Sequence, residues 1–214
     1  MRRTRRLVLE LKILTRQVKG RLIEFPDHPL IMGVVNVTPD SFFDGGRYFD
    51  AAAAVAHALR LVEEGADLLD IGAESTRPGA DVVNEVEECH RVIPVVTAVA
   101  KAVTIPVSID TSKAAVARAA LDAGASLVND VTALRGDSAM ADLIAKTEAG
   151  IVLMHMRGTP RTMQQAPRYD DVVVEISDFF EERISFATAH GIARRQIILD
   201  PGIGFGKLLE HNLA

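Results

Sequence analysis

Residues 122–131 read DAGASLVNDV, and this phrase decides the fold because it recurs along the chain. In each copy a helical segment ends at a glycine, a short apolar run follows, and polar residues come at or near its end. The other copies are EEGADLLDIG at 63–72, EAGIVLMHM at 148–156 and AHGIARRQIILD at 189–200. The glycines suit helix C-caps, where a left-handed backbone carries no Cβ penalty; they are Gly65, Gly124, Gly150 and Gly191.

The apolar runs after these glycines predict buried strands. Runs such as LLDI and IILD are too short for a helix and are typical of strands that are covered on both faces. The segments 51–65 and 111–124 show helical periodicity, and Thr111 or Ser112 is expected to N-cap the second of them. Strands and helices that alternate at this spacing predict an α/β fold with a parallel sheet.

Polar strand ends favour a TIM barrel, (β/α)₈, over an open doubly wound sheet, although periodicity alone allows both. In a barrel the carboxyl ends of all strands converge on one mouth, whereas an open sheet concentrates its site at a switch point. Almost every expected strand ends in polar residues, at Asn36, Asp70 to Glu74, Asp110, Asn129, His155 and Asp200. The chain therefore accounts for about the first six β/α units of such a barrel.

The segment LELKILTRQVKGRLIEF at 9–25 has a different pattern, with two apolar runs around Lys19-Gly20. This pattern predicts a β-hairpin ahead of the first barrel strand, placed to plug the bottom of the barrel. We accordingly divide the chain into an N-terminal extension with the start of the hairpin at 1–20, and a barrel domain at 21–214.

The composition excludes several classes of protein. The 214 residues are 48% hydrophobic and 25% charged, as in a globular protein with a full core. A net charge of -5 argues against a general nucleic-acid binder, and no apolar run reaches the length of a membrane span. Arg5-Arg6 resembles an export signal, but Glu10 and Lys12 interrupt the apolar region that such a signal needs. One cysteine, Cys89, forms no disulfide framework and predicts the cytoplasm.

Carboxylates at strand ends are the first candidates for chemistry. Asp70, Asp110 and Asp200 each end an apolar run, where an unpaired buried charge is unfavourable. Each of them could instead cap the following helix, which is a common role of aspartate at such a junction. Three carboxylates together with Asn129 form a hydrogen-bonding template for a flat ligand that carries several N–H donors along one edge.

Two loops add further candidates. In IGAESTRPGA at 71–80, Arg77 suits an anionic or aromatic amine substrate because guanidinium offers forked donors and a stacking face; otherwise it is a solvated loop residue. DPGIGFGK at 200–207 fails both the phosphate-loop and the dinucleotide-binding patterns. Its glycines are expected to let a flat ring approach the backbone, with Phe205 stacked on that ring.

The histidines show no spacing typical of a zinc site. His155, in LMHMRG, is expected to be a hydrogen-bonded core residue and not a base. Its neighbours Met154 and Met156 are expected to pack in the core or to lie against a ring.

Six segments, in their order along the chain, resemble the successive signatures of the dihydropteroate synthase family, the pterin-binding enzymes that are the targets of sulfonamides. They are GVVNVTPDSFFDGG, DIGAESTRPGA, SIDTSK, LVNDV, LMHMRG and DPGIGFGK. The resemblance implies a TIM barrel that is usually a homodimer. It also implies the transfer of a pterin group: 6-hydroxymethyl-7,8-dihydropterin pyrophosphate condenses with p-aminobenzoate, with Mg²⁺ assistance, to give 7,8-dihydropteroate and pyrophosphate.

The resemblance also implies roles for individual residues. Asp110, Asn129 and Asp200 would hold the polar edge of the pterin, and Met154 and Phe205 would lie near its ring. This is the flat ligand with donors along one edge that the carboxylates suggested.

Further roles concern the second substrate and the leaving group. Asn36 would lie at the Mg²⁺-pyrophosphate, and with Asp110 and Asp200 it completes the set expected to be catalytic. Phe42, in a mobile lid at 37–46, would close over the aminobenzoate ring. The residues that would border p-aminobenzoate are Thr76, Arg77 and Pro78.

The chain departs from the family in length. A typical (β/α)₈ domain takes about 250 residues, and the Ser-Arg-Lys and Arg-x-His segments of the family have no counterpart here, so a C-terminally incomplete member is expected. Two alternatives stay open: a pterin-binding methyltransferase domain, and a non-catalytic pterin-binding protein completed by another chain. The TRPGA and PDSFFDGG segments favour the synthase.

Overall fold

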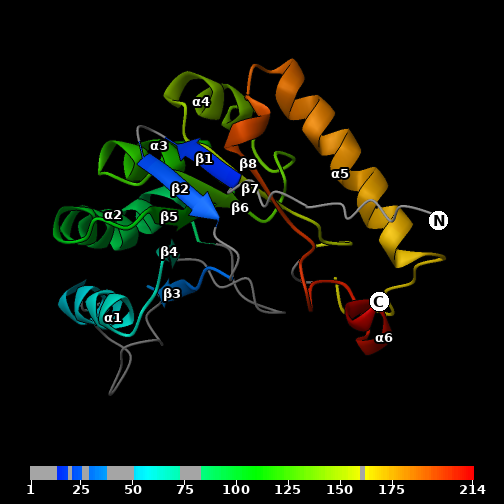
Figure 1. Cartoon of the computed structure of the whole chain (residues 1–214), viewed down its shortest axis with the longest axis horizontal. Helices are drawn as coiled ribbons and strands as arrows, with labels where there is room; N and C mark the ends of the chain where they lie inside the picture. Colours follow the sequence, from blue (N-terminus) through cyan, green and yellow to red (C-terminus); the bar gives the residue numbers. More distant parts are fainter. Residues whose placement is uncertain (1–13, 19–20, 26–28, 38–50, 73–82, 160–161) are drawn as a thin grey trace, which may run out of the picture.

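The computed structural model describes residues 14–18, 21–25, 29–37, 51–72, 83–159 and 162–214. Its parallel strands alternate with helices, as predicted (Figure 1). The strands of the main sheet are β3 (Met32–Asn36), β4 (Leu68–Gly72), β5 (Val107–Asp110), β6 (Leu127–Asp130), β7 (Gly150–Met154) and β8 (Ile197–Asp200). The helices are α1 (Ala51–Glu63), α2 (Glu85–Ala102), α3 (Ala114–Asp122), α4 (Met140–Thr147), α5 (Val172–Ala189) and α6 (Leu209–Leu213), with a 3₁₀ turn η1 at Arg194–Gln196.

The six strands lie in sequence order, β3-β4-β5-β6-β7-β8, and every pair is parallel. A doubly wound sheet reverses its strand order at a switch point, and this sheet has no reversal. Uninterrupted order with a helix after nearly every strand is the arrangement of the first six β/α units of a (β/α)₈ barrel. The predicted fold class is therefore confirmed.

One face of the sheet packs on the helices. Figure 1 shows α1 to α5 following one another around the outside of the strands. Strand residues that point outward join one core with the helices, among them Val35, Leu69, Ile71, Ile109 and Ile151. Because side chains alternate along a strand, the residues between them point to the opposite, concave face. This alternation places Asn36, Asp70, Asp110, Asn129 and Met154 together on the concave face.

The predicted N-terminal hairpin is confirmed. Strand β1 (Leu14–Val18) pairs antiparallel with β2 (Arg21–Phe25), and Val18 lies opposite Arg21. Strand β1 also contacts η1, which directly precedes β8. The hairpin therefore lies toward the amino ends of the strands, as a plug at the bottom of the barrel would.

Two predicted helix caps are wrong. Helix α3 is not capped by Thr111 or Ser112; its N-cap is Lys113, and the Ala114 N–H donates instead to Asp137 Oδ2 at 2.8 Å. A carboxylate from the next loop thus does the work expected of a local hydroxyl.

Gly150 is not a C-cap either, because it is the first residue of β7. Helix α4 ends one position earlier than such a cap requires, and Glu148 takes the left-handed conformation with φ of 53°. The other three glycines of the repeated phrase do have positive φ; they are Gly65, Gly124 and Gly191.

A buried ion pair joins α2 to the loop after β5. Glu88 on α2 is fully buried, and its Oε2 lies 2.6 Å from Lys113 Nζ. Lys113 follows Asp110 by only three positions, so this pair anchors the loop that begins at a predicted site residue.

We predict that Lys113→Met lowers the free energy of unfolding by about 3 kcal/mol, because removing one partner leaves the Glu88 charge buried and unpaired. The matched control is Lys146→Met, since Lys146 is 71% exposed and pairs with Asp142 at 3.6 Å across one helical turn. That variant should lose less than about 0.5 kcal/mol. Urea unfolding measures the free energy of unfolding of both variants. Equal losses would contradict the prediction that the buried pair contributes more to stability than the exposed one.

Candidate functional site

The register of the parallel sheet brings three predicted site residues into one row. Asn36 lies opposite Gly72, Gly72 opposite Asp110, and Asp110 opposite Asn129, across strands β3 to β6. Gly72 has no side chain to crowd Asp110; a Cβ at this position would stand only 3.1 Å from the Asp110 Cβ. An amide, a carboxylate and a second amide therefore line one rim of the concave face.

Asp70 holds the Asn129 side chain from below. Asn129 Nδ2 donates to Asp70 Oδ2 at 2.8 Å, so the amide carbonyl oxygen Oδ1 is turned the other way. That oxygen is buried and has no hydrogen-bond partner within the described part of the chain. From the sequence, Asp70 is expected to join Asp110, Asp200 and Asn129 in a template for a flat ligand. In the structure its carboxylate instead accepts from the Asn129 amide and orients that side chain.

Asp70 is only 5% exposed. Burial raises the pKa of its carboxyl, while the Ser108 hydroxyl and the Asn129 amide act in the opposite direction. Ser108 lies opposite Asp70 on β5. A buried polar layer thus underlies the rim, in a position where an apolar residue would give Asn129 no partner.

Asp130, next to Asn129, organises the loop that follows β6. It is fully buried and accepts hydrogen bonds from the Thr132 N–H, the Thr132 hydroxyl and the Leu134 N–H at 2.6 to 2.8 Å. These bonds hold Ala133 and Leu134 at positive φ. Burial raises the pKa of Asp130, and the hydrogen bonds to Thr132 and Leu134 oppose that shift.

Met154 and Asp200 end the neighbouring strands β7 and β8 and lie opposite each other. Met154 packs in an apolar cluster with Met156 and Met163, and Phe205 lies against this cluster. Asp200 Oδ1 accepts from the Gly202 N–H at 2.7 Å. Both residues are expected near the pterin ring, and the structure brings their side chains into one apolar cluster.

The loops after β7 and β8 interlock through their backbones. Gln164 Nε2 donates to the Gly204 carbonyl at 2.5 Å, and the Tyr169 hydroxyl donates to the Gly206 carbonyl at 2.8 Å. A Cβ on Gly202 would stand 2.1 Å from the His155 carbonyl oxygen, and one on Gly206 would stand 2.7 Å from the Arg157 carbonyl oxygen.

This close approach of the two backbones explains why glycines stand in DPGIGFGK. The interpretation that they admit a flat ring is wrong for Gly202 and Gly206, because the backbone of the β7 loop already occupies that space. Gly204 differs, since nothing lies within 4 Å of its Cβ position.

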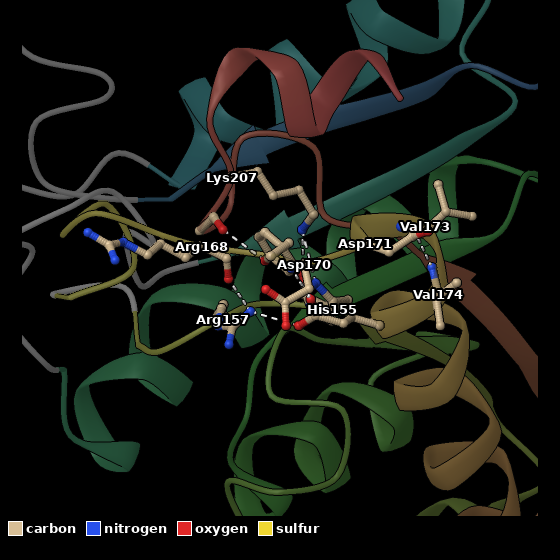
Figure 2. Close-up of polar contacts among 11 residues, drawn as sticks. His155, Arg157, Arg168, Asp170, Asp171, Val173, Val174 and Lys207 are labelled. Atoms are coloured by element: carbon tan, nitrogen blue, oxygen red, sulfur yellow. Dashed lines mark hydrogen bonds and ion pairs between the residues drawn. The ribbon is translucent and has the colours of Figure 1, made fainter.

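Lys207 points into the protein. The residue is 4% exposed, and its Nζ lies 3.0 Å from His155 Nδ1 (Figure 2). It also lies 3.0 Å from the Gly202 carbonyl oxygen and 3.1 Å from the Phe205 carbonyl oxygen. Burial lowers the pKa of Lys207 to about 8, and the negative charge of Asp200 acts in the opposite direction. The rejection of a phosphate loop therefore agrees with the place of its lysine.

His155 is the hydrogen-bonded core residue that the sequence predicted. It is 6% exposed, and its ring meets Phe179 edge-on with ring centroids 5.0 Å apart. Burial, followed by the charge of Lys207, lowers the pKa of His155 to about 4. An ammonium group only donates, so Nδ1 of a neutral imidazole is the acceptor in this pair.

Arg157 ties the β7 loop to α5. Its Nη1 donates to the Arg168 carbonyl (Figure 2). The same nitrogen lies 2.8 Å from Glu175 Oε2, and the guanidinium stacks over the Tyr169 ring at 4.8 Å. The Asp171 carboxylate caps α5 by accepting from two backbone N–H groups of its first turn. The connection between β7 and α5 is thus held by Arg157 at its start and by Asp171 at its end.

Other predicted site residues lie outside the described residues, namely Phe42, Thr76, Arg77 and Pro78. Asn36 is described and exposed at the rim. Among the described residues, no group of three or more His, Cys, Asp and Glu side chains is placed to hold a metal ion. Asn36 offers a neutral oxygen of the kind that Mg²⁺ accepts, and Mg²⁺ commonly takes most of its other ligands from substrate phosphates and water. The residue therefore fits the predicted metal role.

Comparison with known proteins places this geometry in a family. Residues 32–214 match the family model described as "Pterin binding enzyme". The dihydropteroate synthase of Escherichia coli (strain K12) is 48% identical over 187 residues, which are 87% of this chain and 66% of that protein. That of Neisseria meningitidis serogroup B is 50% identical over 192 residues, 88% of this chain and 67% of that protein. The chain thus spans about two thirds of the length of these curated relatives.

Solved structures of dihydropteroate synthases also match this chain. Xanthomonas albilineans dihydropteroate synthase with 4-aminobenzoic acid superimposes with a TM-score of 0.86 at 50% identity, over 94% of this chain and 71% of that chain. The Yersinia pestis enzyme with a sulfonamide drug complex gives a TM-score of 0.85 at 46% identity, over 93% and 72%. The six-stranded sheet therefore has the arrangement of the matching part of these enzymes.

We predict that Gly202→Ala destabilises the chain more than Gly204→Ala. Both glycines have positive φ, 67° and 82°, so both variants carry the strain of a left-handed alanine, about 1 kcal/mol. Only Gly202→Ala also drives a methyl group into the His155 carbonyl, which should add at least about 2 kcal/mol. Urea unfolding measures both losses; equal losses would show that the two loops do not approach as closely as described.

We predict that stability depends on the protonation of His155. The unfolded chain binds this proton below pH 6.5, whereas the folded chain does not until about pH 4. Its contribution is therefore complete above pH 6.5 and is lost as the pH falls toward 4, by between about 1 and 3 kcal/mol. Urea unfolding across this window should show a shallower pH dependence for His155→Asn than for the wild type, and identical slopes would contradict the prediction.

Proposed function

Because the chain belongs to the pterin-binding enzyme family, we propose that it acts as a dihydropteroate synthase. In this reaction 6-hydroxymethyl-7,8-dihydropterin pyrophosphate condenses with p-aminobenzoate to give 7,8-dihydropteroate and pyrophosphate. The observation that carries the proposal is the row of Asn36, Asp110 and Asn129 at the carboxyl ends of β3, β5 and β6. Similar enzymes have been solved with 4-aminobenzoic acid and with 7,8-dihydropteroate.

The pterin would lie with its polar edge on the rim and its ring on the apolar cluster. The carboxylates of Asp110 and Asp200 accept its N–H groups, and so does the Asn129 oxygen that has no partner in the described part of the chain. Met154 and Phe205 supply the apolar surface for the ring. Acceptors on the rim and an apolar surface beside them suit a planar heterocycle that carries donors along one side.

The p-aminobenzoate would lie beside the pterin, toward the loops after β3 and β4. Thr76, Arg77 and Pro78 border it in this proposal, and Phe42 closes over its ring. Arg77 suits the carboxylate of this substrate because guanidinium pairs with carboxylates through two parallel hydrogen bonds.

The chain's own carboxylates would act on the charge that develops on the pterin. As the C–O bond to pyrophosphate breaks, the pyrophosphate leaves with the electron pair and positive charge grows on the methylene group. Asp110 and Asp200 stabilise that charge, since fixed groups aimed at developing charge lower the barrier. The arylamine nitrogen then forms the C–N bond and loses a proton.

Asn36 would hold Mg²⁺ together with the pyrophosphate. When bound, Mg²⁺ offsets the negative charge of the leaving group. The exposed position of Asn36 supports this role. It lies on the rim opposite Gly72, which in turn lies opposite Asp110 on the next strand.

Further parts of the proposal concern the state of the protein in the cell. We propose a cytoplasmic homodimer whose p-aminobenzoate site also accepts sulfonamides. The sulfonamide complex of a similar enzyme supports the sulfonamide part of this proposal. Among the described helices none is both long and apolar enough to cross a membrane.

We predict that Asp110→Asn lowers the turnover of dihydropterin pyrophosphate by about 10²- to 10³-fold, because it removes a charge aimed at the cationic methylene. The measurement is pyrophosphate release that depends on both p-aminobenzoate and Mg²⁺. Asp122→Asn, at an exposed position at the end of α3, is the matched control and should keep wild-type turnover.

Each outcome separates one function from another. Near-normal turnover by a folded Asp110→Asn variant would overturn the assignment of this carboxylate. Pterin binding by the wild type without turnover would favour a non-catalytic pterin-binding protein, and methyl transfer to a corrinoid protein would favour the methyltransferase class.

A further inference from the structure

Lys207 is a buried cation that the proposed reaction does not use. It closes the segment GFGK, where a lysine usually suggests a phosphate ligand, yet it is 4% exposed. A lysine loses much solvation and side-chain entropy when it is buried. Such a lysine needs a compensating set of partners, and those partners indicate what it does.

The partners of Lys207 use all of its donors. An ammonium group has three N–H bonds, and three acceptors lie at 3.0 to 3.1 Å: His155 Nδ1 and the carbonyl oxygens of Gly202 and Phe205. The carbonyl oxygen of His155 is a fourth neighbour at 3.4 Å. No N–H of Lys207 remains to contact a substrate, so its effect on one must be indirect.

Two of these acceptors belong to the loop after β8. By binding the carbonyls of Gly202 and Phe205 from inside, Lys207 curls residues 202–207 around its own ammonium group. Positive φ at Gly202, Gly204 and Gly206 permits this curl.

The third acceptor lies on the loop after β7. His155 is held rigidly, because its ring packs on Phe179 at 5.0 Å and near Tyr169 at 6.0 Å. The backbone is joined as well, since the His155 N–H donates to the Asp200 carbonyl at 2.9 Å. Lys207 therefore joins the loop after β8 to His155 on the loop after β7 (Figure 2).

The curled loop carries two groups of the proposed pterin site. Asp200 precedes it and accepts from the Gly202 N–H at 2.7 Å. Phe205 lies within it and rests on the cluster of Met154, Met156 and Met163. The Phe205 carbonyl is bound directly by Lys207, so the place of its ring depends on that bond.

We infer that Lys207 is a positioning residue, whose buried ammonium group fastens the β8 loop to His155 of the β7 loop and thereby sets where Phe205 meets the pterin ring. The inference rests on the proposed pterin site for its ligand but not for its geometry. The depressed pKa of His155 agrees with it, because only a neutral imidazole accepts from an ammonium group.

The first experiment tests the geometry without any ligand. The chain has no tryptophan, so Phe205→Trp introduces a single fluorescent reporter on the loop. In that background, Lys207→Met should raise acrylamide quenching at least about twofold, because a loop released from its anchor opens locally at little free-energy cost. Lys146→Met, at an exposed lysine, should leave quenching unchanged. Unchanged quenching in Lys207→Met would overturn the inference.

The second experiment tests the consequence for ligand binding by calorimetric titration with 6-hydroxymethylpterin. Lys207→Met should weaken Kd about tenfold, as expected for a lost charged hydrogen bond that acts on the site. In a double-mutant cycle with Phe205→Ala the two losses should not add, because Lys207 acts through Phe205. Additive losses would mean that Lys207 only stabilises the fold, and would overturn the inference.

A milder pair of variants covers the case in which Lys207→Met does not fold. His155→Asn keeps an acceptor at the place of Nδ1, whereas His155→Leu removes it. The leucine variant should show the increased quenching and the weaker pterin affinity, and the asparagine variant should restore most of both. Equal behaviour of the two would contradict a role for the Lys207 bond.

Failure of the proposed function gives a different result. If the wild type does not bind the pterin, the function is wrong, while the quenching of the Phe205→Trp reporter still decides whether Lys207 positions the loop.

Discussion

The register of the parallel hydrogen-bond ladder from β3 to β8 is the constraint on which the structure depends. It sets Asn36, Gly72, Asp110 and Asn129 side by side and sends the residues between them into the core with the helices. A shift of one residue would turn every side chain of a strand to the other face. Apolar residues such as Leu69, Ile71 and Ile109 would then lie on the concave face, so burial of the core and assembly of the site depend on the same register.

A polar layer supports the rim, and it breaks the usual rule that buried positions are apolar. Three carboxylates are buried, those of Asp70, Asp130 and Glu88. Asp70 is bonded to Asn129, Asp130 to Thr132, and Glu88 to Lys113. Such groups contribute little net stability and are strongly destabilising when one partner is removed. They fix orientation instead, because each one holds a residue or loop at the end of a strand. Local exceptions to simple patterning concentrate where function requires a fixed geometry.

The loops after β7 and β8 are joined by several contacts. Gly202 and Gly206 let the two backbones approach, the Tyr169 and Gln164 side chains bond across, and the His155 and Lys207 pair closes the interior. Loops that carry binding groups are usually the mobile part of a fold. Here the loop that carries the proposed binding groups is held by a neighbouring loop that is itself tied to α5 through Arg157. Such an arrangement would lower the conformational entropy lost on binding the proposed ligand.

Local patterns in the sequence determined the alternation of strands and helices, the hairpin and the polar ends of the strands, because periodicity and turn chemistry are properties of neighbouring residues. They also brought Asn36, Asp110, Asn129 and Asp200 forward as site residues. The tertiary structure alone decided that Asp137 caps α3, that Asp70 orients Asn129 and that Lys207 turns inward to His155. In these pairs the partners stand 23, 59 and 52 positions apart. No local pattern encodes such contacts, since they form only when the register of the sheet brings distant strand ends together.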